Sequence, residues 1–369
     1  MDALFPFGFP GPTAMYLTFY IVTGVIYGVF MNYTLAGAIL LAMGRLRPFL
    51  GSRWARPGLI EKVVGDWLPA MLGMAITTGV APLLFLQILH KQSFYTANLL
   101  LFHRFMLFLP ALIVAYYMLY LLKSKRLDVW GPWPPASALT IVVLCFIFVA
   151  WAWTENHLLS LHHELWGEFY GSGRWFYADA ELWPRLGFTV TVSFATLALV
   201  VAWQFVWGRG GHETSSLDLA ARQLRLLAVV ALATSAAEAV LWFLWLDTPA
   251  RAALRSSLAM PYAALALVGI TLQAACWLPV KSGADLTAKR LGLATAGAVA
   301  MLVGAGVARE ARRLAAVDLG SLLESHRHAA AVGGITLFLA CFLLNAGVIG
   351  YCAWLIKRDI AMARPSRVN

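Results

Sequence analysis

Side chains that can bind a cofactor or accept a proton gather in one stretch of the sequence, residues 82–104. The stretch reads PLLFLQILHKQSFYTANLLLFHR and contains Gln87, His90, His103 and Arg104. Its apolar runs predict the end of one membrane-spanning helix, a polar turn at 91–93 and the start of the next helix. A cation inside a bilayer costs at least about 2.5 kcal/mol, so Arg104 needs a partner or a functional role.

Two cofactors fit these residue types. Two histidines on neighbouring antiparallel helices are the ligands that a b-type haem uses, and an arginine can pair with the haem propionates. His90, His103 and Arg104 supply that set. A quinone site needs less, namely a proton-accepting His or Glu and an apolar slot lined by aromatic residues. The residues that offer this are Gln87, His103, Glu238 and Tyr95.

Glu238 is a third ionisable residue inside an apolar run. At 1.5 Å per residue it lies ~12 Å from the outer end of its span, and His103 and Arg104 lie about two turns into theirs. The matching depths predict a hydrogen bond from Arg104 or His103 to Glu238, which would offset the cost of burying each group alone. Such a pair either fixes helix packing or handles a proton beside a cofactor. In the second case Glu238 and His103 are the catalytic residues.

The composition predicts an all-α integral membrane protein. Of 369 residues, 61% are hydrophobic and 12% are charged, whereas soluble domains carry about 25% charged residues. No long polar insert divides the chain, so residues 1–369 are expected to form one transmembrane helical domain. We predict a bundle of about nine spans, each near the ~20 residues that cross a bilayer. The spans are approximately 15–43, 67–90, 96–122, 137–157, 186–207, 226–246, 258–280, 288–307 and 331–356.

The distribution of basic residues predicts the orientation of the bundle. Most of the 28 Lys and Arg residues fall in the loops that follow the first, third, fifth and seventh spans and in the C-terminal tail. The positive-inside rule therefore places the N-terminus outside and the C-terminus in the cytoplasm. It also explains the net charge of +10 without nucleic acid. With this orientation every histidine except His212 lies at or near the outer face: His90, His103, His157, His162, His163, His326 and His328.

Two outer segments have sequence patterns of their own. Residues 157–183 begin with leucines at helical spacing, which predicts an amphipathic helix, and continue with aromatic residues typical of the headgroup level. We interpret this segment as a lid, with His157 and His163 on its polar side as further cofactor ligands. In the basic segment 308–328, Arg309, Arg312 and Arg313 share a helical face. Lipid phosphate is the expected contact, and anionic cofactor groups or an acidic partner are alternatives.

Other chemistries lack the required spacing. The lid histidines and His326-x-His328 do not match the HExxH pattern that places two metal ligands on one helix face, so no metal site is predicted. The four cysteines lie in apolar runs without CxxC. Nucleotide-binding and acyl-transfer motifs are absent.

These observations predict a membrane subunit of a respiratory or electron-transfer complex. It would bind haem b or quinol near the extracytoplasmic face of a bacterial inner membrane and exchange electrons with a periplasmic cytochrome. Its partners would be lipids and other subunits. A transporter or channel with an outward-facing site, and a non-catalytic membrane anchor, are the alternatives, so the residues alone do not decide whether the chain is an enzyme.

Overall fold

The computed structural model describes residues 9–50, 58–208, 213–246, 248–331, 336–344, 347, 351 and 354. Among them, eight helices are long and apolar enough to span a membrane. This confirms the predicted all-α polytopic membrane bundle. The eight helices are α1 (Gly11–Leu46), α2 (Leu59–Leu89), α4 (Phe102–Lys123), α5 (Trp133–Leu159), α7 (Leu182–Trp207), α8 (Thr214–Trp245), α10 (Met260–Trp277) and α11 (Ala288–Ala315).

The ninth predicted span, 331–356, lies largely outside the described residues, as does His212. Within it, Thr336–Leu344 is helical. The chain divides into two compact units. The described residues up to Ala14 belong with those from Leu319 onward, including α12 (Leu319–Ala331), and Met15–Asp318 form the larger unit.

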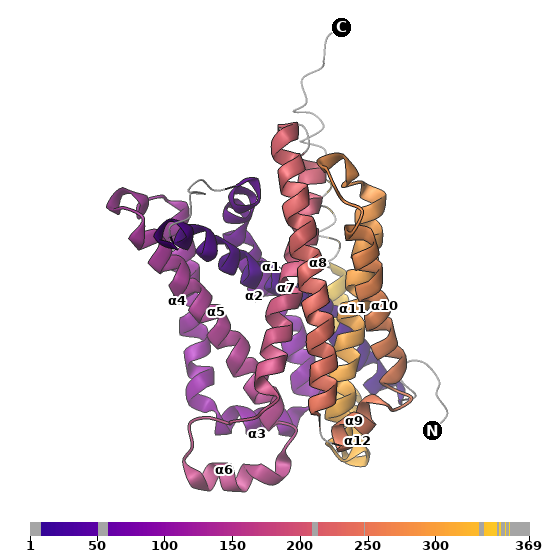
Figure 1. Cartoon of the computed structure of the whole chain (residues 1–369). Helices are drawn as coiled ribbons and strands as arrows, with labels where there is room; N and C mark the ends of the chain where they lie inside the picture. The colour runs from indigo at the N-terminus through magenta and orange to yellow at the C-terminus, as the bar shows by residue number, and fades with distance from the viewer. Residues whose placement is uncertain are drawn as a thin grey trace. The chain divides into compact units, whose positions relative to one another are not determined.

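Three short helices join the spans at one end of the larger unit (Figure 1). They are α3 (Lys91–Leu100), α6 (Trp166–Ser172) and α9 (Thr248–Leu254). We call this end the α3 end; it is the predicted outer end. The connections from α4 to α5 and from α10 to α11 lie at the opposite end.

The region around His90 differs from its prediction. The polar turn expected at 91–93 is wrong, because α2 ends at Leu89 and Lys91 already begins α3. The helix breaks again at Leu101, so the predicted third span, 96–122, is the end of α3 followed by α4. The polar residues of α3 disfavour a position within the hydrocarbon. As a result His103 and Arg104 lie in the first turn of α4 rather than two turns inside a span.

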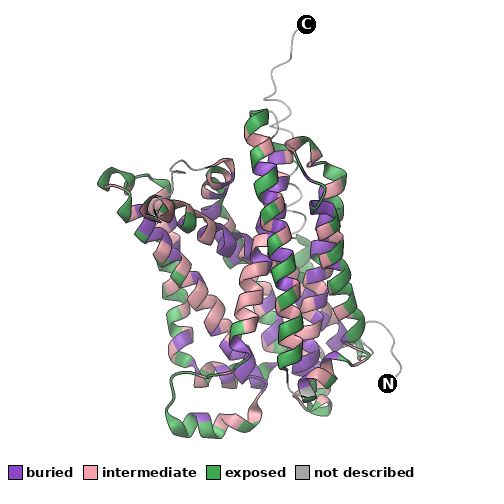
Figure 2. Cartoon of the chain, in the orientation of Figure 1, coloured by how far each residue is buried: buried purple, intermediate pink, exposed green. Residues whose placement is uncertain are grey.

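Burial separates the inner and outer faces of the helices (Figure 2). The core is apolar and contains Leu68, Leu197, Phe205 and Leu224, all fully buried. Large apolar side chains are exposed along the outer faces of α4 and α8. A soluble protein would not expose such continuous apolar surface, but a bilayer covers it at no cost.

The α10–α11 pair is the closest helix contact that the glycines reveal. A Cβ atom built on Gly269 would lie 2.4 Å from the carbonyl oxygen of Gly297, and one built on Gly304 would lie 2.3 Å from the carbonyl oxygen of Tyr262. The small residues of α11 therefore serve contact within the chain, because only they allow two membrane helices to approach at backbone distance.

We expect Gly269→Ala to lower the free energy of unfolding by about 1–3 kcal/mol, the usual cost of overpacking. Gly292→Ala on the open face of α11, where an added Cβ meets no atom within 4 Å, should be neutral or slightly stabilising. Thermal unfolding of the purified protein in detergent measures both. Equal midpoints for the two variants would contradict the close packing of α10 on α11.

Candidate functional site

Buried ionisable side chains of the larger unit gather at the α3 end. They come from the ends of α2, α5 and α11 and from the beginnings of α4 and α7, which the antiparallel connections bring together. Among the described residues of this unit, the buried histidines, arginines and carboxylates are His90, Arg104, Glu155, His157, Glu181, Glu310, Arg312 and Arg313. All of them belong to this end.

His90 and Glu310 form the centre of one group. Nε2 of His90 lies 2.9 Å from the Glu310 carboxylate, and both side chains are buried. Arg313 donates a 3.0 Å hydrogen bond to the same carboxylate, and Arg309 donates a 2.7 Å bond to the hydroxyl of Tyr20. We call these five residues the His90 cluster. Nδ1 of His90 has no hydrogen-bond partner among the described residues.

The His90 ring is neutral near pH 7. Burial lowers its pKa, and the hydrogen bond and negative charge of Glu310 oppose that effect without cancelling it. When Nε2 carries the proton and donates to Glu310, Nδ1 is an unused acceptor. The pair therefore has the arrangement of a base supported by a carboxylate.

A second group connects α11 to the start of α7. Arg312 donates two hydrogen bonds to Glu181, at 2.5 and 3.0 Å. Arg185 lies 3.1 Å from the same carboxylate, and the indole of Trp242 donates to it at 3.1 Å. Because Arg312 and Arg313 are consecutive, one turn of α11 holds both groups.

His157 lies in the last turn of α5, where the adjacent Leu158 packs with Leu182 at the start of α7 and with Ala316 at the end of α11. It is only 4% exposed, and neither ring nitrogen has a partner among the described residues. The charges of Arg185, Arg309, Arg312 and Arg313 all act on its ring.

Arg104 belongs to a third group. Its guanidinium pairs with Glu155 of α5 at 3.0 Å, donates to the carbonyl oxygen of Trp175 at 3.0 and 3.3 Å and stacks between the rings of Trp151 and Phe176 at 4.4 and 4.5 Å. Glu155 also accepts a 2.8 Å bond from the backbone N–H of Tyr177. This group fastens the segment after α6 to α4 and α5.

The predicted pairing of Glu238 with Arg104 or His103 is not formed. Glu238, on α8, accepts a 2.6 Å hydrogen bond from Thr191 of α7. His103 is half-buried, and its Nε2 lies 3.2 Å from the carbonyl oxygen of Trp175. Equal depth along two spans did not make them neighbours, because α8 packs on α7 and α4 packs on α5.

The remaining predicted residues lie outside the His90 cluster and the Glu181 group, or at their edge. Gln87 is half-buried on α2, one turn before His90. His163 lies 3.1 Å from the hydroxyl of Ser93 on α3, and its ring packs at a tilt against that of Trp166, with the ring centroids 4.5 Å apart. It belongs to a short 3₁₀ helix, His163–Leu165. The single amphipathic helix predicted at the beginning of residues 157–183 is wrong, because α5 ends at Leu159 and α6 begins at Trp166.

The sequence analysis missed the carboxylates that the arginines use. Part of the signal was present: Glu310 and Arg313 are three residues apart, and Glu181 and Arg185 are four apart, spacings that pair side chains on one helix. Glu155 with Arg104 and Glu181 with Arg312 join distant parts of the chain, and no local pattern indicates them.

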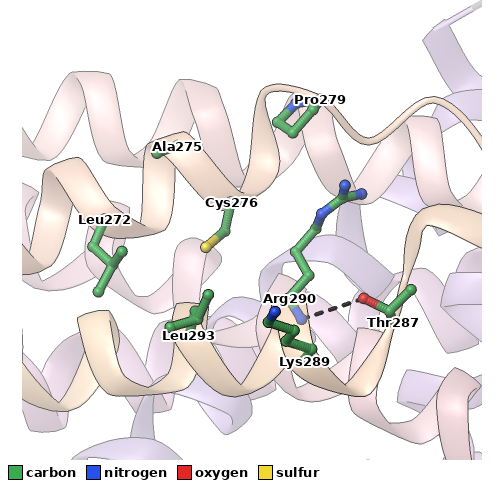
Figure 3. A pocket seen from close by; sticks show the side chains of 8 residues that line it. All are labelled: Leu272, Ala275, Cys276, Pro279, Thr287, Lys289, Arg290 and Leu293. Atoms are coloured by element: carbon green, nitrogen blue, oxygen red, sulfur yellow. Dashed lines mark hydrogen bonds between the residues drawn. The ribbon is translucent and has the colours of Figure 1, made fainter.

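A hollow of about 450 Å³ lies at the turn between α10 and α11. Cys276 and Arg290 extend into the space between the two helices (Figure 3). It is at the end opposite α3 and contains none of the predicted site residues. Among the described residues, no three histidine, cysteine or carboxylate side chains gather as metal ligands. Comparison with protein-family models and with curated proteins finds no match to this sequence.

Glu155→Gln should destabilise the protein by about 3–5 kcal/mol, because it leaves the buried Arg104 cation unpaired. Glu238→Gln keeps an acceptor for Thr191 and should cost at most about 1.5 kcal/mol. Thermal unfolding in detergent gives the order of stability of the two variants. Amide hydrogen exchange at Tyr177 reports whether the segment after α6 is released from α4 and α5. The reverse order would support a pairing of Arg104 with Glu238.

The Glu181 pair should make stability depend on pH. Burial alone would raise the pKa of Glu181, but the hydrogen bond from Arg312 and the charges of Arg185 and Arg312 outweigh it and hold the pKa below 4.5. A carboxyl whose pKa falls on folding stabilises the folded state above its unfolded pKa, and this contribution is lost as pH falls through the folded value. The midpoint temperature of unfolding should therefore decrease as the pH is lowered below about 5. The decrease should be less steep in Glu181→Gln. The matched control is Glu324→Gln, in an exposed pair with Arg327; a slope equal to that of this control would contradict the prediction for Glu181.

Proposed function

We propose that the chain is a membrane subunit of an electron-transfer complex in which the His90 cluster binds a quinol and accepts its proton. The observation that carries this proposal is the free Nδ1 of His90, buried beside a carboxylate that holds Nε2. A quinol hydroxyl could donate the hydrogen bond that Nδ1 does not receive from the described residues. Gln87, one turn away on α2, offers an amide for the second quinol oxygen.

The chemistry follows from the His90–Glu310 pair. Oxidation of a quinol to a quinone releases two protons and two electrons. One hydroxyl proton passes to Nδ1 of His90, and the imidazolium that forms is stabilised by Glu310. The second proton leaves toward the outer aqueous side. The electrons pass one at a time to a haem acceptor, in a partner subunit or in an extracytoplasmic cytochrome.

Haem b bound to this chain is the less supported version. Ligation usually uses one imidazole nitrogen and leaves the other to donate a hydrogen bond. Nε2 of His90 is engaged by Glu310, and Nε2 of His103 lies within hydrogen-bond distance of the Trp175 carbonyl oxygen. A haem ligated through Nε2 of both histidines would have to displace both contacts.

A transporter is favoured less because the buried charges are confined to one end. Among the described residues of the larger unit, none of the buried histidines, arginines and carboxylates lies in the middle of a span. A route for ions across the membrane usually requires such groups at depth. A purely structural anchor has no use for an unpaired buried acceptor.

Replacement of His90 tests the function. His90→Gln keeps a hydrogen bond to Glu310 but cannot take up a proton, so quinol oxidation by the purified intact complex should fall ~100-fold or more in kcat, with little change in KM. A short-chain quinol with ferricyanide as acceptor measures the rate. His163→Gln, at a half-buried position beside Ser93, is the matched control and should retain activity.

Two results would overturn the proposal. One is a wild-type complex that carries no extractable quinone and shows no quinol-dependent reduction of the acceptor. The other is unchanged kcat in His90→Gln. A reduced-minus-oxidised spectrum of the purified chain with a haem band that disappears in His90→Gln would instead support the haem version.

A further inference from the structure

The surroundings of His157 have hydrogen-bond donors without acceptors. Nε of Arg185 and Nε of Arg313 are buried and make no hydrogen bond among the described residues, and both ring nitrogens of His157 are equally unused. Nε of Arg309 makes no hydrogen bond either, although it lies 3.5 Å from the Glu310 carboxylate. Buried polar atoms are normally satisfied, so several of them together around one buried side chain indicate a missing acceptor.

The charge balance points the same way. Four arginines act on His157, whereas the buried carboxylates beside them are Glu181 and Glu310. Asp179, which acts on Arg185, is a third carboxylate nearby. Even with Asp179 counted, positive charge is in excess. Both buried carboxylates are already used, Glu181 by Arg312 and Glu310 by His90 and Arg313.

We infer that His157 and Arg185, Arg309 and Arg313 form a binding site for a phosphate group. Arginine suits phosphate because its planar guanidinium offers several N–H donors and is always charged. The imidazole of His157 adds one more donor. The site shares Arg309 and Arg313 with the His90 cluster, but it does not use Nδ1 of His90, the atom that takes the quinol proton in the function proposed above.

Two sources of phosphate fit the position of the site. It lies at the end of the membrane-spanning helices, where lipid headgroups are found, and basic pockets between such helices bind anionic lipids. The Arg309 side chain is 40% exposed and so provides an opening. Inorganic phosphate in the aqueous phase can enter by the same opening.

The test uses the full-length protein, purified in a neutral detergent without added quinone. Native mass spectrometry detects a retained phospholipid, and thermal unfolding of delipidated protein is followed with millimolar phosphate against chloride at equal ionic strength. One retained anionic phospholipid per chain supports the lipid source. Stabilisation by phosphate but not by chloride, without retained lipid, supports the free ion.

His157→Phe is the first variant, because the side chain that it removes makes no hydrogen bond that the fold would lose. Its affinity for phosphate or for added anionic lipid should fall tenfold or more, and Arg309→Gln, at the opening, should act in the same direction. His163→Phe is the matched control and should bind as wild type does. The inference is overturned if wild type binds neither ligand, or if His157→Phe and Arg309→Gln bind as tightly as wild type.

Quinol oxidation need not follow phosphate binding. Suppose that His157→Phe loses the phosphate or lipid binding of wild type, while wild type itself does not oxidise quinol. This result would support the phosphate site and contradict the proposed function. Normal quinol oxidation in a wild type that binds no phosphate would do the opposite. The two ideas therefore fail separately.

Discussion

The arrangement of the α3 end depends on the cost of taking arginine out of water. A buried guanidinium is tolerated only where carboxylates and other acceptors surround it, and removal of one partner is then costly. Arg312 and Arg313 meet this requirement on two different helices, through Glu181 at the start of α7 and Glu310 near their own position on α11. Because Glu310 also holds His90 at the end of α2, one turn of α11 connects α2 and α7. The same constraint makes the His90 ring a supported base.

Arg104 shows the same constraint solved with different partners. Its charge is met by Glu155, by a backbone carbonyl and by two aromatic faces. The outcome is structural, since the residues that satisfy the cation are those of the chain segment that it anchors. Arg104 therefore has the partner that its burial requires. A functional role is less supported for Arg104 than for the arginines around His157, because those have N–H donors that make no hydrogen bond among the described residues.

Much of this could be predicted from the sequence, and the limit is physical. Composition and apolar runs suffice to predict the bundle, because an apolar stretch of about 20 residues is typical of a membrane-spanning helix. The placement of His90 and His157 at the same end of the bundle could also be predicted. The partners of the buried charges could not be predicted. Glu238 and Glu155 are both carboxylates in apolar helices, and only the adjacency of α4 with α5 decides which of them pairs with Arg104. The break at Leu101 was hidden because the apolar residues on both sides read as one run.

The two ends of the bundle use charge in opposite ways. At the end opposite α3, ion pairs such as Arg45–Asp128 and Arg290–Asp285 are 29–50% exposed, and exposed pairs contribute little to stability. Their basic residues agree with a role in orientation, which needs charge but no burial. At the α3 end the pairs are buried and carry a desolvation cost that an apolar core would avoid. Fold stability alone does not account for such a cost, least of all for His157, whose ring nitrogens make no hydrogen bond among the described residues. The α3 end is therefore where function is to be sought.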